Sequence, residues 1–336
     1  MSDTLRVGVI GAGAIAQVAH LNVLGKLAET EIAGICDIDV GKAQALASRF
    51  GVRDVYDDIE DLLRYGQLDA VAVCTPNHLH EVHVITALSA GVPVLCERPL
   101  ALTAGGVERV IAARERASVP VMVGMNHRFR SDVQAVRSFL VGGELGTLRA
   151  IREHWHIFRP VGPVAGWRER RAESGGGAMF DLGLPLVDLA LWLVDCPAEK
   201  RITAAFSSMN DPSRVESFGS ALIQCRAGHN TFVDVSWHHV GPAERFMVEV
   251  MGDTGSATIS PLGVYKEMHG APLNVTPPVG GRVGDPFSAS YRAEWEHFIG
   301  IVRGSTPAPD LTDQLRLHRV MEAIRRSAQE GVEVTL

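Results

Sequence analysis

The sequence predicts an α/β protein with two domains, a doubly wound parallel sheet followed by an α+β domain with a large, mostly antiparallel sheet. The chain has 336 residues, which is too long for one small core and suits two domains of ordinary size. Up to about residue 124, uninterrupted apolar runs alternate with helical patterns, as in parallel strands covered on both faces. After Asn126, long stretches alternate apolar and polar residues at period two, which indicates a sheet with two distinct faces. We therefore expect domains at 1–124 and 125–336.

Within the first domain, five apolar runs read as strands and four helical patterns separate them. The runs are RVGVIG, EIAGICD, DAVAVCTP, PVLCERP and PVMVGMN, in chain order. The helices between them are expected to begin near Ala14, Gly41, Leu79 and Thr103. Strands linked by helices in this order give a parallel, doubly wound sheet.

The second domain is expected to contain at least five strands. They are RAIREHWHIF, KRITAAFSSM, SALIQCRAG, NTFVDVSWHH and RFMVEVMGD, with hairpin breaks at AGHN and MGDTG. A wide sheet that carries aromatic residues such as Trp155 and Trp237 needs cover on both sides, so we expect one face to pack against a second subunit in a homodimer or homotetramer. The Pro- and Gly-rich segment 272–286 is expected to be a surface loop.

Composition excludes several classes of function. The chain carries 32 basic and 39 acidic residues, a net charge of −7, which argues against a nucleic-acid-binding footprint and favours small-molecule partners. No apolar run reaches the roughly 18 residues of a membrane helix, and the start MSDTLRVGVIG has neither a signal core nor a transit-peptide pattern, so we expect a cytoplasmic protein. The five cysteines lack zinc spacing and are expected to be reduced packing residues. No metal-ligand pattern emerges.

The first strand runs into a glycine-rich turn typical of dinucleotide binding. Gly11, Gly13 and Ala16 have the G-x-G-x-x-[GA] spacing directly after a strand and at the start of a helix, where free N–H groups face phosphates. Asp37 ends the second strand, 21 residues after Ala16, where a carboxylate accepts hydrogen bonds from a ribose 2′-OH. This carboxylate would repel a 2′-phosphate, so NAD is favoured over NADP. The alternative is a plain glycine turn with a surface aspartate.

A second group of polar residues follows the third apolar run, in CTPNHLH. Thr75, Pro76, Asn77 and His80 would lie at the carboxyl edge of the sheet, where open α/β sheets bind ligands. A lone helix histidine is more often a satisfied structural residue, but this position favours a role for His80 at the cofactor.

Together with CERPL, MNHRF and GGGAMFDLGLPLVDLALWL, these segments resemble the Gfo/Idh/MocA family of NAD(P)-dependent oxidoreductases. The resemblance covers essentially the whole chain. It implies an N-terminal Rossmann domain, a C-terminal domain whose sheet often serves oligomerisation, and activity on CH–OH groups of sugars, polyols and their derivatives. The cofactor-binding residues that we predict are Gly11, Gly13, Ala14, Ile15, Ala16, Asp37, Thr75, Pro76, Asn77, His80, Glu97, Arg98 and Asn126.

The chain departs from this family at two positions that usually surround the reacting carbon. The family motifs are EKP, and GGG followed by D-x-G-x-H-x-x-D. Here Glu97 matches the glutamate and Asp181 and Asp188 match the aspartates, whereas Arg98 stands at the lysine position and Pro185 at the histidine position. Positions 181, 185 and 188 fall on one helical face, and a proline near a helix start is structurally tolerated.

These departures bear on the proton that alcohol oxidation must remove. A guanidinium stays protonated, so Arg98 cannot be the base, although it can orient a carboxylate or stabilise an alkoxide. The alternative is an Arg98–Glu97 pair that only positions the cofactor. Asp181 is the best proton acceptor, unless it merely caps a helix. His156 and His127 are possible replacements for the missing histidine, and we predict Arg98, Asp181 and His156 as catalytic residues.

Other residues near these motifs leave more than one interpretation open. Trp167 and Arg168 could lie over the substrate and form an anionic pocket with Arg98, or RERR could be a solvated surface. His238 and His239 are adjacent, so they point to opposite faces of a strand and cannot share one metal. At the level of function, the main alternatives to a dehydrogenase are an enzyme that cycles tightly bound NAD and a sensor or scaffold that binds dinucleotide without net catalysis.

Overall fold

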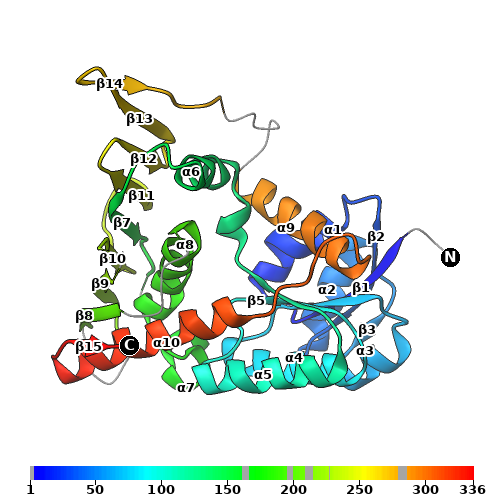
Figure 1. Ribbon diagram of the computed structural model, residues 1–336. Helices are drawn as coiled ribbons and strands as arrows, with labels where there is room; N and C mark the ends of the chain where they lie inside the picture. The colour runs from blue at the N-terminus through cyan, green and yellow to red at the C-terminus, as the bar shows by residue number, and fades with distance from the viewer. Residues whose placement is uncertain (1–3, 161–165, 195–199, 209–214, 227, 279–285) are drawn as a thin grey trace. The chain divides into compact units, whose positions relative to one another are not determined.

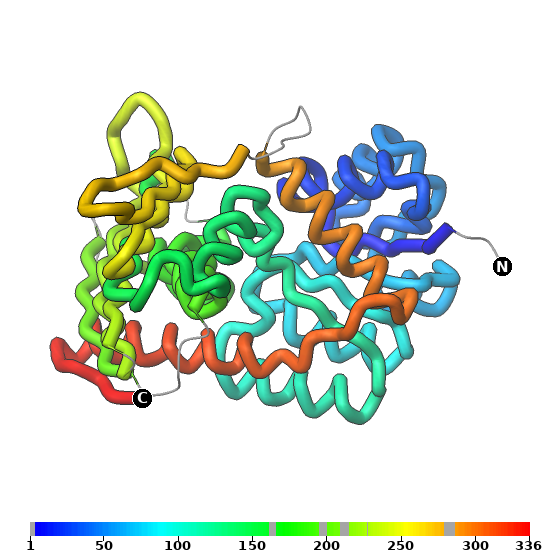
Figure 2. The backbone as a smooth tube through the Cα atoms, turned by 45° about the horizontal axis from the view of Figure 1, so that its top comes forward, coloured from blue at the N-terminus to red at the C-terminus, as the bar shows by residue number. Residues whose placement is uncertain are grey.

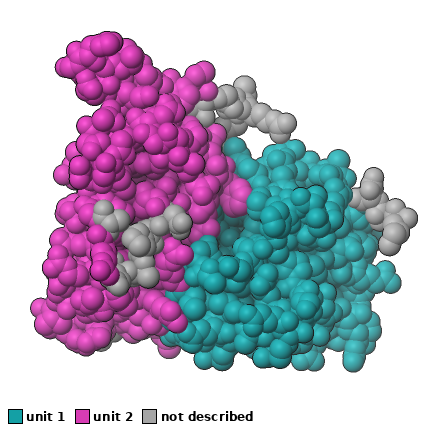
Figure 3. Space-filling view, in the orientation of Figure 1, with its two compact units in different colours: residues 1–126, 283–315 teal, residues 127–282, 316–336 magenta. Residues whose placement is uncertain are grey.

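The computed structural model describes residues 4–160, 166–194, 200–208, 215–226, 228–278 and 286–336. It divides into two compact units, shown in Figure 3: unit 1 comprises residues 1–126 and 283–315, and unit 2 comprises residues 127–282 and 316–336. The first change of unit lies next to the expected boundary at 124. Residues 283–315, which we expected in the second domain, cluster with unit 1 instead.

Unit 1 is built on a six-stranded parallel sheet. Its strands are β1 (Leu5–Ile10), β2 (Thr30–Cys36), β3 (Val55–Tyr56), β4 (Ala70–Val73), β5 (Val94–Glu97) and β6 (Val121–Gly124). Their order is β3-β2-β1-β4-β5-β6, with every neighbouring pair parallel. This is the strand order of a dinucleotide-binding fold, with the direction of winding reversing between β1 and β4. The predicted fold of the N-terminal part is confirmed.

The four helices predicted for unit 1 begin within about two residues of their expected starts, whereas α3 (Ile59–Tyr65) was not predicted. The first is helical from Ala14 and includes the π-helical turn η1 (Ala16–His20) and α1 (Leu21–Leu24). Asp39 caps α2 and Thr103 caps α5, each by accepting a backbone N–H with its side chain. The remaining bounds are α2 (Val40–Phe50), α3 (Ile59–Tyr65), α4 (Asn77–Ser89), α5 (Ala104–Ala117) and the turn η2 (Asn126–Phe129).

The segment that returns to unit 1 is α9 (Pro286–Val302). It packs against α1, and Figures 1 and 2 show the two side by side although about 270 residues separate them in the chain. On the other side of the sheet, α4 packs against α5 (Figure 1). The alternating order that marks the first domain in the sequence gives no sign of this late return.

Unit 2 contains a nine-stranded sheet in which only β7 and β10 pair in parallel. The order is β14-β13-β12-β11-β7-β10-β9-β8-β15, so the predicted mostly antiparallel sheet is confirmed. The five predicted strands are β7 (Leu148–His156), β8 (Lys200–Ser207), β9 (Phe218–Cys225), β10 (Asn230–Ser236) and β11 (Arg245–Gly252). Four more are β12 (Gly255–Ile259), β13 (Gly263–Met268), β14 (Ala271–Asn274) and β15 (Val334–Thr335).

Strand β14 occupies part of the segment predicted as a loop. A tight turn at His269 and Gly270, both with positive φ, folds it back onto β13, and its proline lies at the sheet edge where no ladder N–H is required. Residues 279–285 of that predicted loop lie outside the described residues.

One face of this sheet is covered by α6 (Ser131–Val141) and α8 (Leu184–Val194). Leu189 and Leu193 of α8 join Val136 of α6 and strand residues such as Ile151 in a buried apolar cluster. The stretch Arg171–Val194, which ends with α8, is long and apolar enough to cross a membrane by length and composition alone, but 78% of its apolar window is buried inside the protein, as in a core helix. Other helices are η3 (Trp167–Glu169), α7 (Arg171–Ser174), η4 (Met179–Gly183) and α10 (Thr312–Glu330).

Three of the cysteines agree with the prediction and one does not. Cys36, Cys74 and Cys96 are free and buried. Cys225 is disulfide-bonded, so the prediction of a reduced packing residue is wrong there, because spacing along the chain does not reveal which thiols meet. Cys196 lies outside the described residues.

Candidate active site

The turn after β1 contains two glycines with different roles: one is required by the backbone conformation, and the other leaves an open surface where a phosphate can approach. Gly11 has φ +98°, and a Cβ there would lie 2.8 Å from the backbone of Cys74 and Thr75, so only glycine fits. At Gly13 a Cβ would meet nothing closer than the Cys74 carbonyl oxygen at 3.8 Å, so its outer surface is open. Ala16 is fully buried and packs the following helix on the sheet. The turn therefore fits the pyrophosphate of a dinucleotide.

Asp37 is fixed beside this turn by two backbone N–H groups. Its Oδ2 accepts from Ala12 N at 2.7 Å and its Oδ1 accepts from Asp39 N at 2.9 Å. The carboxylate is thus held at the end of β2 with its side chain only partly buried. A carboxylate held in this way suits the hydroxyls of an adenosine ribose.

At the end of β4 the predicted residues divide into two layers. Thr75, Pro76 and Asn77 are half-buried, and Pro76 is the N-cap residue of α4. His80 lies beneath them, buried, with Nδ1 2.6 Å from the Pro99 carbonyl oxygen and Nε2 2.7 Å from the Thr75 carbonyl oxygen. Because backbone carbonyls occupy both of its ring nitrogens, His80 connects the ends of β4 and β5 and does not face the open edge.

Glu97 and Asn126 are also buried at this edge. Glu97 lies 2.8 Å from Nε2 of His20, and Asn126 Nδ2 donates to Ser290 Oγ of α9 at 3.2 Å. Burial raises the pKa of Glu97, but the hydrogen bond from His20 and the positive charge of Arg98 outweigh it and lower the pKa overall. Glu97 is therefore a buried carboxylate, while Arg98 beside it is half-buried.

In unit 2, Asp181 receives two hydrogen bonds on one carboxylate oxygen. Its Oδ2 accepts from Arg159 Nη2 at 3.0 Å and from Trp237 Nε1 at 3.1 Å. The Arg159 guanidinium also lies over the Trp237 ring, 4.4 Å from its centroid. These two donors fix the orientation of the Asp181 carboxylate. Asp181 lies within η4 and is not a helix cap.

The helix around Asp181 changes its winding before Pro185. Residues Met179–Gly183 form a π-helical turn, and Pro185 is the second residue of α8. A proline has no N–H to give to the carbonyl four residues earlier, here that of Asp181, and its ring clashes with that carbonyl in an α-helix. The helix begins at Ala178, so Pro185 lies further inside it than the sequence suggests, and the wider turn accommodates the ring.

The glycine run before this helix fits tightly against Glu216. Gly177 N donates to Glu216 Oε1 at 2.8 Å, and a Cβ on Gly177 would lie 1.8 Å from the Glu216 backbone oxygen. The run therefore lets the start of the helix lie directly against the segment that leads into β9. Upstream, the Arg168 guanidinium lies over the Trp167 ring at 4.3 Å, within η3.

Asp188 is buried in an ion pair within unit 2. Arg128, from the MNHRF segment, forms a two-pronged ion pair with its carboxylate, and Asp188 is buried. The neighbouring Glu153 on β7 is also buried, and neither of its oxygens has a hydrogen-bond partner. Burial first, and then the charge of Asp188, raise the pKa of Glu153 well above its usual value.

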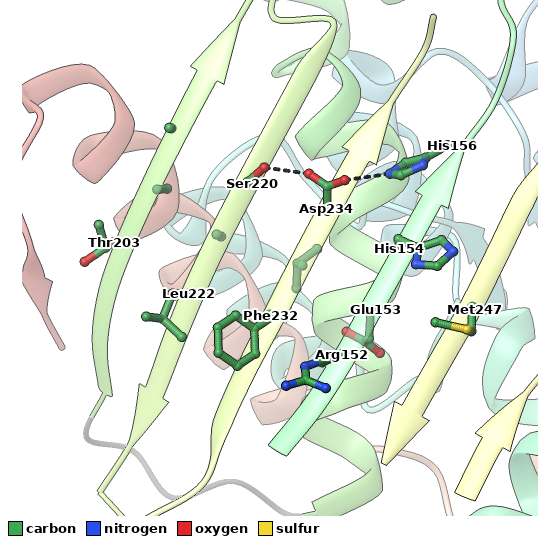
Figure 4. Close-up of a pocket in the computed structure, with 14 residues that line it drawn as sticks. Arg152, Glu153, His154, His156, Thr203, Ser220, Leu222, Phe232, Asp234 and Met247 are labelled. Atoms are coloured by element: carbon green, nitrogen blue, oxygen red, sulfur yellow. Dashed lines mark hydrogen bonds and ion pairs between the residues drawn. The ribbon is translucent and has the colours of Figure 1, made fainter. Parts of the chain in front are cut away.

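His156 lies on the opposite face of the sheet from Asp181. Its Nε2 is 2.7 Å from Asp234 Oδ2, and Ser220 Oγ donates to Asp234 Oδ1 at 2.5 Å (Figure 4). These side chains line an open hollow of about 550 Å³ on the sheet face that α8 leaves free. Neighbouring residues of a strand alternate between faces, and Ile151 and Glu153 of β7 point to the helices. The structure therefore does not bring His156 and Asp181 together.

His127, the other possible replacement, and the adjacent pair His238 and His239 have aromatic neighbours in unit 2. His127 stacks on Phe246 at 5.0 Å between ring centroids, and its ring meets Trp155 edge-on at 5.2 Å. The ring centroids of His239 and His156 are 5.8 Å apart, and those of His238 and Phe218 are also 5.8 Å apart. Within the described ranges, no three His, Cys, Asp or Glu side chains gather in a way that could hold a metal ion.

Comparison with known families identifies the chain. Residues 5–125 match the model of an oxidoreductase family with an NAD-binding Rossmann fold, GFO/IDH/MocA, and residues 133–258 match the GFO/IDH/MocA C-terminal domain. The chain belongs to the Gfo/Idh/MocA family.

Several Gfo/Idh/MocA relatives align along nearly the whole chain. D-glucoside 3-dehydrogenase of Escherichia coli K12 is 26% identical over 360 residues, covering 100% of this chain and 98% of the relative. D-apiose dehydrogenase of Paraburkholderia graminis is 29% identical over 340 residues, covering 98% and 88%. GenD2 from gentamicin A biosynthesis, solved with NAD, superposes with a TM-score of 0.86 at 28% identity, covering 100% and 97%.

In this Gfo/Idh/MocA oxidoreductase, the residues predicted to bind the cofactor lie in unit 1. Gly11, Gly13, Asp37, Thr75 and Asn77 lie at the carboxyl ends of neighbouring strands, as predicted from the motifs. Ala14 and Ile15 form the helix start beside them.

Sequence reasoning missed Arg159, Trp237 and His20. Trp237 was noted only as an aromatic residue of the sheet, and nothing in the sequence linked it to Asp181. His20 lies four residues after Ala16 on the helix that follows the glycine turn, and this spacing was the one signal available.

Proposed function

We propose that the protein is an NAD-dependent dehydrogenase that oxidises a hydroxyl group of a sugar, a polyol or a related hydroxy compound. The observation that carries this proposal is the glycine turn with Asp37 fixed beside it at the carboxyl edge of a parallel sheet. The relatives named dehydrogenases of D-glucoside and D-apiose support the substrate class.

The cofactor would be held by the residues of the carboxyl edge of unit 1. The open surface at Gly13 and the N–H groups at the helix start suit the pyrophosphate, and Asp37 suits the ribose and disfavours a 2′-phosphate. Ile38, whose side chain is 92% exposed next to Asp37, offers apolar surface for the adenine. NAD, when bound, supplies the hydride acceptor, and the protein must handle the proton.

Asp181 is the proton acceptor in this proposal. Arg159 and Trp237 hold its carboxylate in a fixed orientation, as positioning of a general base requires. Arg98 cannot take the proton, and we assign to it the polarisation or orientation of the substrate, with a preference for a substrate that bears an acid group. The hydrogen bond of His156 with Asp234 on the other sheet face argues against a catalytic role for this histidine.

The departures at Arg98 and Pro185 keep two other functions open to test. One is an enzyme that oxidises and re-reduces its substrate with tightly held NAD, and the other is a sensor or scaffold that binds dinucleotide and ligand without turnover. Both retain the cofactor edge, so binding of NAD alone does not separate them from a dehydrogenase.

The test is NADH formation at 340 nm against a panel of sugars, inositols and sugar acids, with Asp181→Asn beside the wild type. We expect steady NADH release by the wild type and a decrease in kcat of about 10²- to 10⁴-fold in D181N, the usual contribution of a general base. Asp253→Asn, the same chemical change at the turn between β11 and β12, serves as control. Tight NAD binding with no turnover on any compound would favour the sensor, and turnover of substrate without net NADH would favour the internal cycle.

We also propose that the protein acts in the cytoplasm as a homodimer or homotetramer, joined through the sheet face of unit 2 that α6 and α8 do not cover. The exposed Phe232 and the hollow of about 550 Å³ on that face supply apolar surface for a second copy.

A further inference from the structure

A buried hydrogen-bonded chain of three side chains lies under the cofactor edge of unit 1. Trp295 Nε1, from α9, donates to His20 Nδ1 at 3.1 Å, and His20 Nε2 lies 2.8 Å from Glu97 Oε1. His20 and Trp295 are fully buried and Glu97 is 7% exposed. The rings of Trp295 and Tyr291 both meet the His20 ring edge-on.

The chemistry of these groups decides which atom donates and which accepts in each of these hydrogen bonds. An indole N–H is a donor only, so His20 Nδ1 must accept, and Nε2 then carries the hydrogen that points at Glu97. Glu97 therefore receives a hydrogen bond whose donor is oriented by α9, the segment that returns to unit 1 from the C-terminal part of the chain.

A second buried carboxyl, Glu294, lies nearby without such donors, whereas Glu97 is hydrogen-bonded to both His20 and Tyr291. Glu294 is fully buried on α9, and neither of its oxygens has a hydrogen-bond partner. Burial first, and then the charge of Glu97, raise the pKa of Glu294 well above its usual value, so Glu294 is a neutral acid. Two buried carboxyls thus lie close enough to affect each other, and the one bonded to His20 is the one that carries the charge.

Glu97 ends β5 and directly precedes Arg98. In this sheet the pyrophosphate site lies at β1 and Asp37 lies at β2, so the adenosine half of a dinucleotide extends toward β2 and its nicotinamide half toward β4 and β5. The positive charge of Arg98, the next residue, in turn lowers the pKa of Glu97.

We propose that His20 is a positioning residue, which orients Glu97 at the end of β5, directly before Arg98, at the nicotinamide half of the cofactor site. This inference rests on the proposed function, in which NAD binds at this edge. His20 touches neither cofactor nor substrate and acts through Glu97.

Two substitutions separate this role from simple packing. The amide nitrogen of glutamine lies near the place of His Nε2, so His20→Gln keeps a donor for Glu97 and loses the acceptor for Trp295. Asparagine reaches only the place of Nδ1, so His20→Asn keeps the acceptor and loses the donor. His297→Gln, an exposed histidine on the same helix α9 as Trp295, is the control.

The measurement is calorimetric titration of each variant with NADH and with ADP-ribose, which lacks the nicotinamide. We expect H20N to weaken NADH binding by about tenfold or more, the effect of losing a hydrogen bond to a charged group, with ADP-ribose affinity within about twofold of wild type. We expect H20Q and H297Q to keep the NADH to ADP-ribose ratio of the wild type.

Two results would overturn the inference. Equal NADH to ADP-ribose ratios in H20N and H20Q would show that the donor to Glu97 does not matter. Equal losses for both ligands in both variants, together with lower melting temperatures, would assign His20 to core packing alone. Failure of the wild type to bind ADP-ribose at all would instead contradict the dinucleotide site and with it the proposed function.

Discussion

At the scale of single residues, the cofactor turn shows that two glycines of one motif are required for different reasons. Gly11 is needed by the fold, because its φ of +98° and the Cys74 backbone 2.8 Å from a Cβ exclude any side chain. Gly13 is not needed by the fold, because a Cβ there has its nearest neighbour at 3.8 Å. What Gly13 provides is free surface for a ligand to approach the backbone.

Substitution of each glycine by alanine tests this difference. Gly11→Ala should lower the stability of unit 1 by about 2 kcal/mol or more, because both the backbone and its neighbours must shift. Gly13→Ala should leave the melting temperature within about 2 °C of wild type and weaken NAD binding about tenfold or more, because the added methyl meets the pyrophosphate. Thermal melts and calorimetry of both variants measure this. Unchanged NAD affinity in G13A would contradict a pyrophosphate at this turn.

At the scale of elements, the packing of α8 on β7 encloses an acid that no hydrogen bond satisfies. Glu153 points into the apolar layer between strand and helix, next to the Arg128–Asp188 ion pair. Burial raises the pKa of Glu153 well above its usual value of 4.5, so the folded protein keeps the proton that the unfolded chain releases. Above about pH 4.5, Glu153 therefore destabilises the fold increasingly as pH rises, until the folded state ionises as well.

Glu153→Gln removes this titration, so the variant should become more stable than the wild type by a growing amount as the pH rises. We expect the free energy of unfolding of E153Q relative to wild type to increase between pH 5 and pH 8, by at most about 1.4 kcal/mol per pH unit. Urea denaturation at several pH values measures it. Glu249→Gln, a half-exposed carboxyl on the neighbouring strand β11, is the matched control. A difference between E153Q and wild type that stays constant with pH would show that Glu153 is ionised in the fold.

At the scale of the whole molecule, the two sheets differ in how many of their faces are covered by helices. The parallel sheet of unit 1 has helices on both sides, whereas the nine-stranded sheet of unit 2 has α6 and α8 on one side. The other side carries Phe232, 40% exposed, and Leu222 around the hollow shown in Figure 4. A wide sheet with an apolar free face is suited to pairing with a second copy of itself.

A charge in the middle of that face should prevent association. We expect the wild type to sediment as a dimer or tetramer and Phe232→Asp to sediment as a smaller species, because a buried, unpaired carboxylate costs several kcal/mol at an interface. Sedimentation velocity compares the two. Val82→Asp, a 51% exposed position on α4 of unit 1, is the control. A monomeric wild type, or an F232D variant with unchanged sedimentation, would exclude this face as the interface.

Much of unit 1 could be predicted because its signals are local. A buried strand, a capping Asp39 or Thr103 and a glycine turn are each encoded within a few residues, so the doubly wound parallel sheet followed from pattern and spacing. The candidate site in unit 2 could be predicted only in part. Asp181 followed from the family motif, whereas the assignment of His156 beside it depended on which face of β7 points to the helices.

By itself, the sequence therefore determined the two fold types, the family, and the two departures from the family motifs, Arg98 and Pro185. Only the tertiary structure decided what holds the charged groups in place. Trp295 and His20 are 275 residues apart, and Trp237 and Asp181 are 56 apart. Such pairs leave no periodic pattern in the chain, because they exist only once helices and strands have packed and water has been excluded between them.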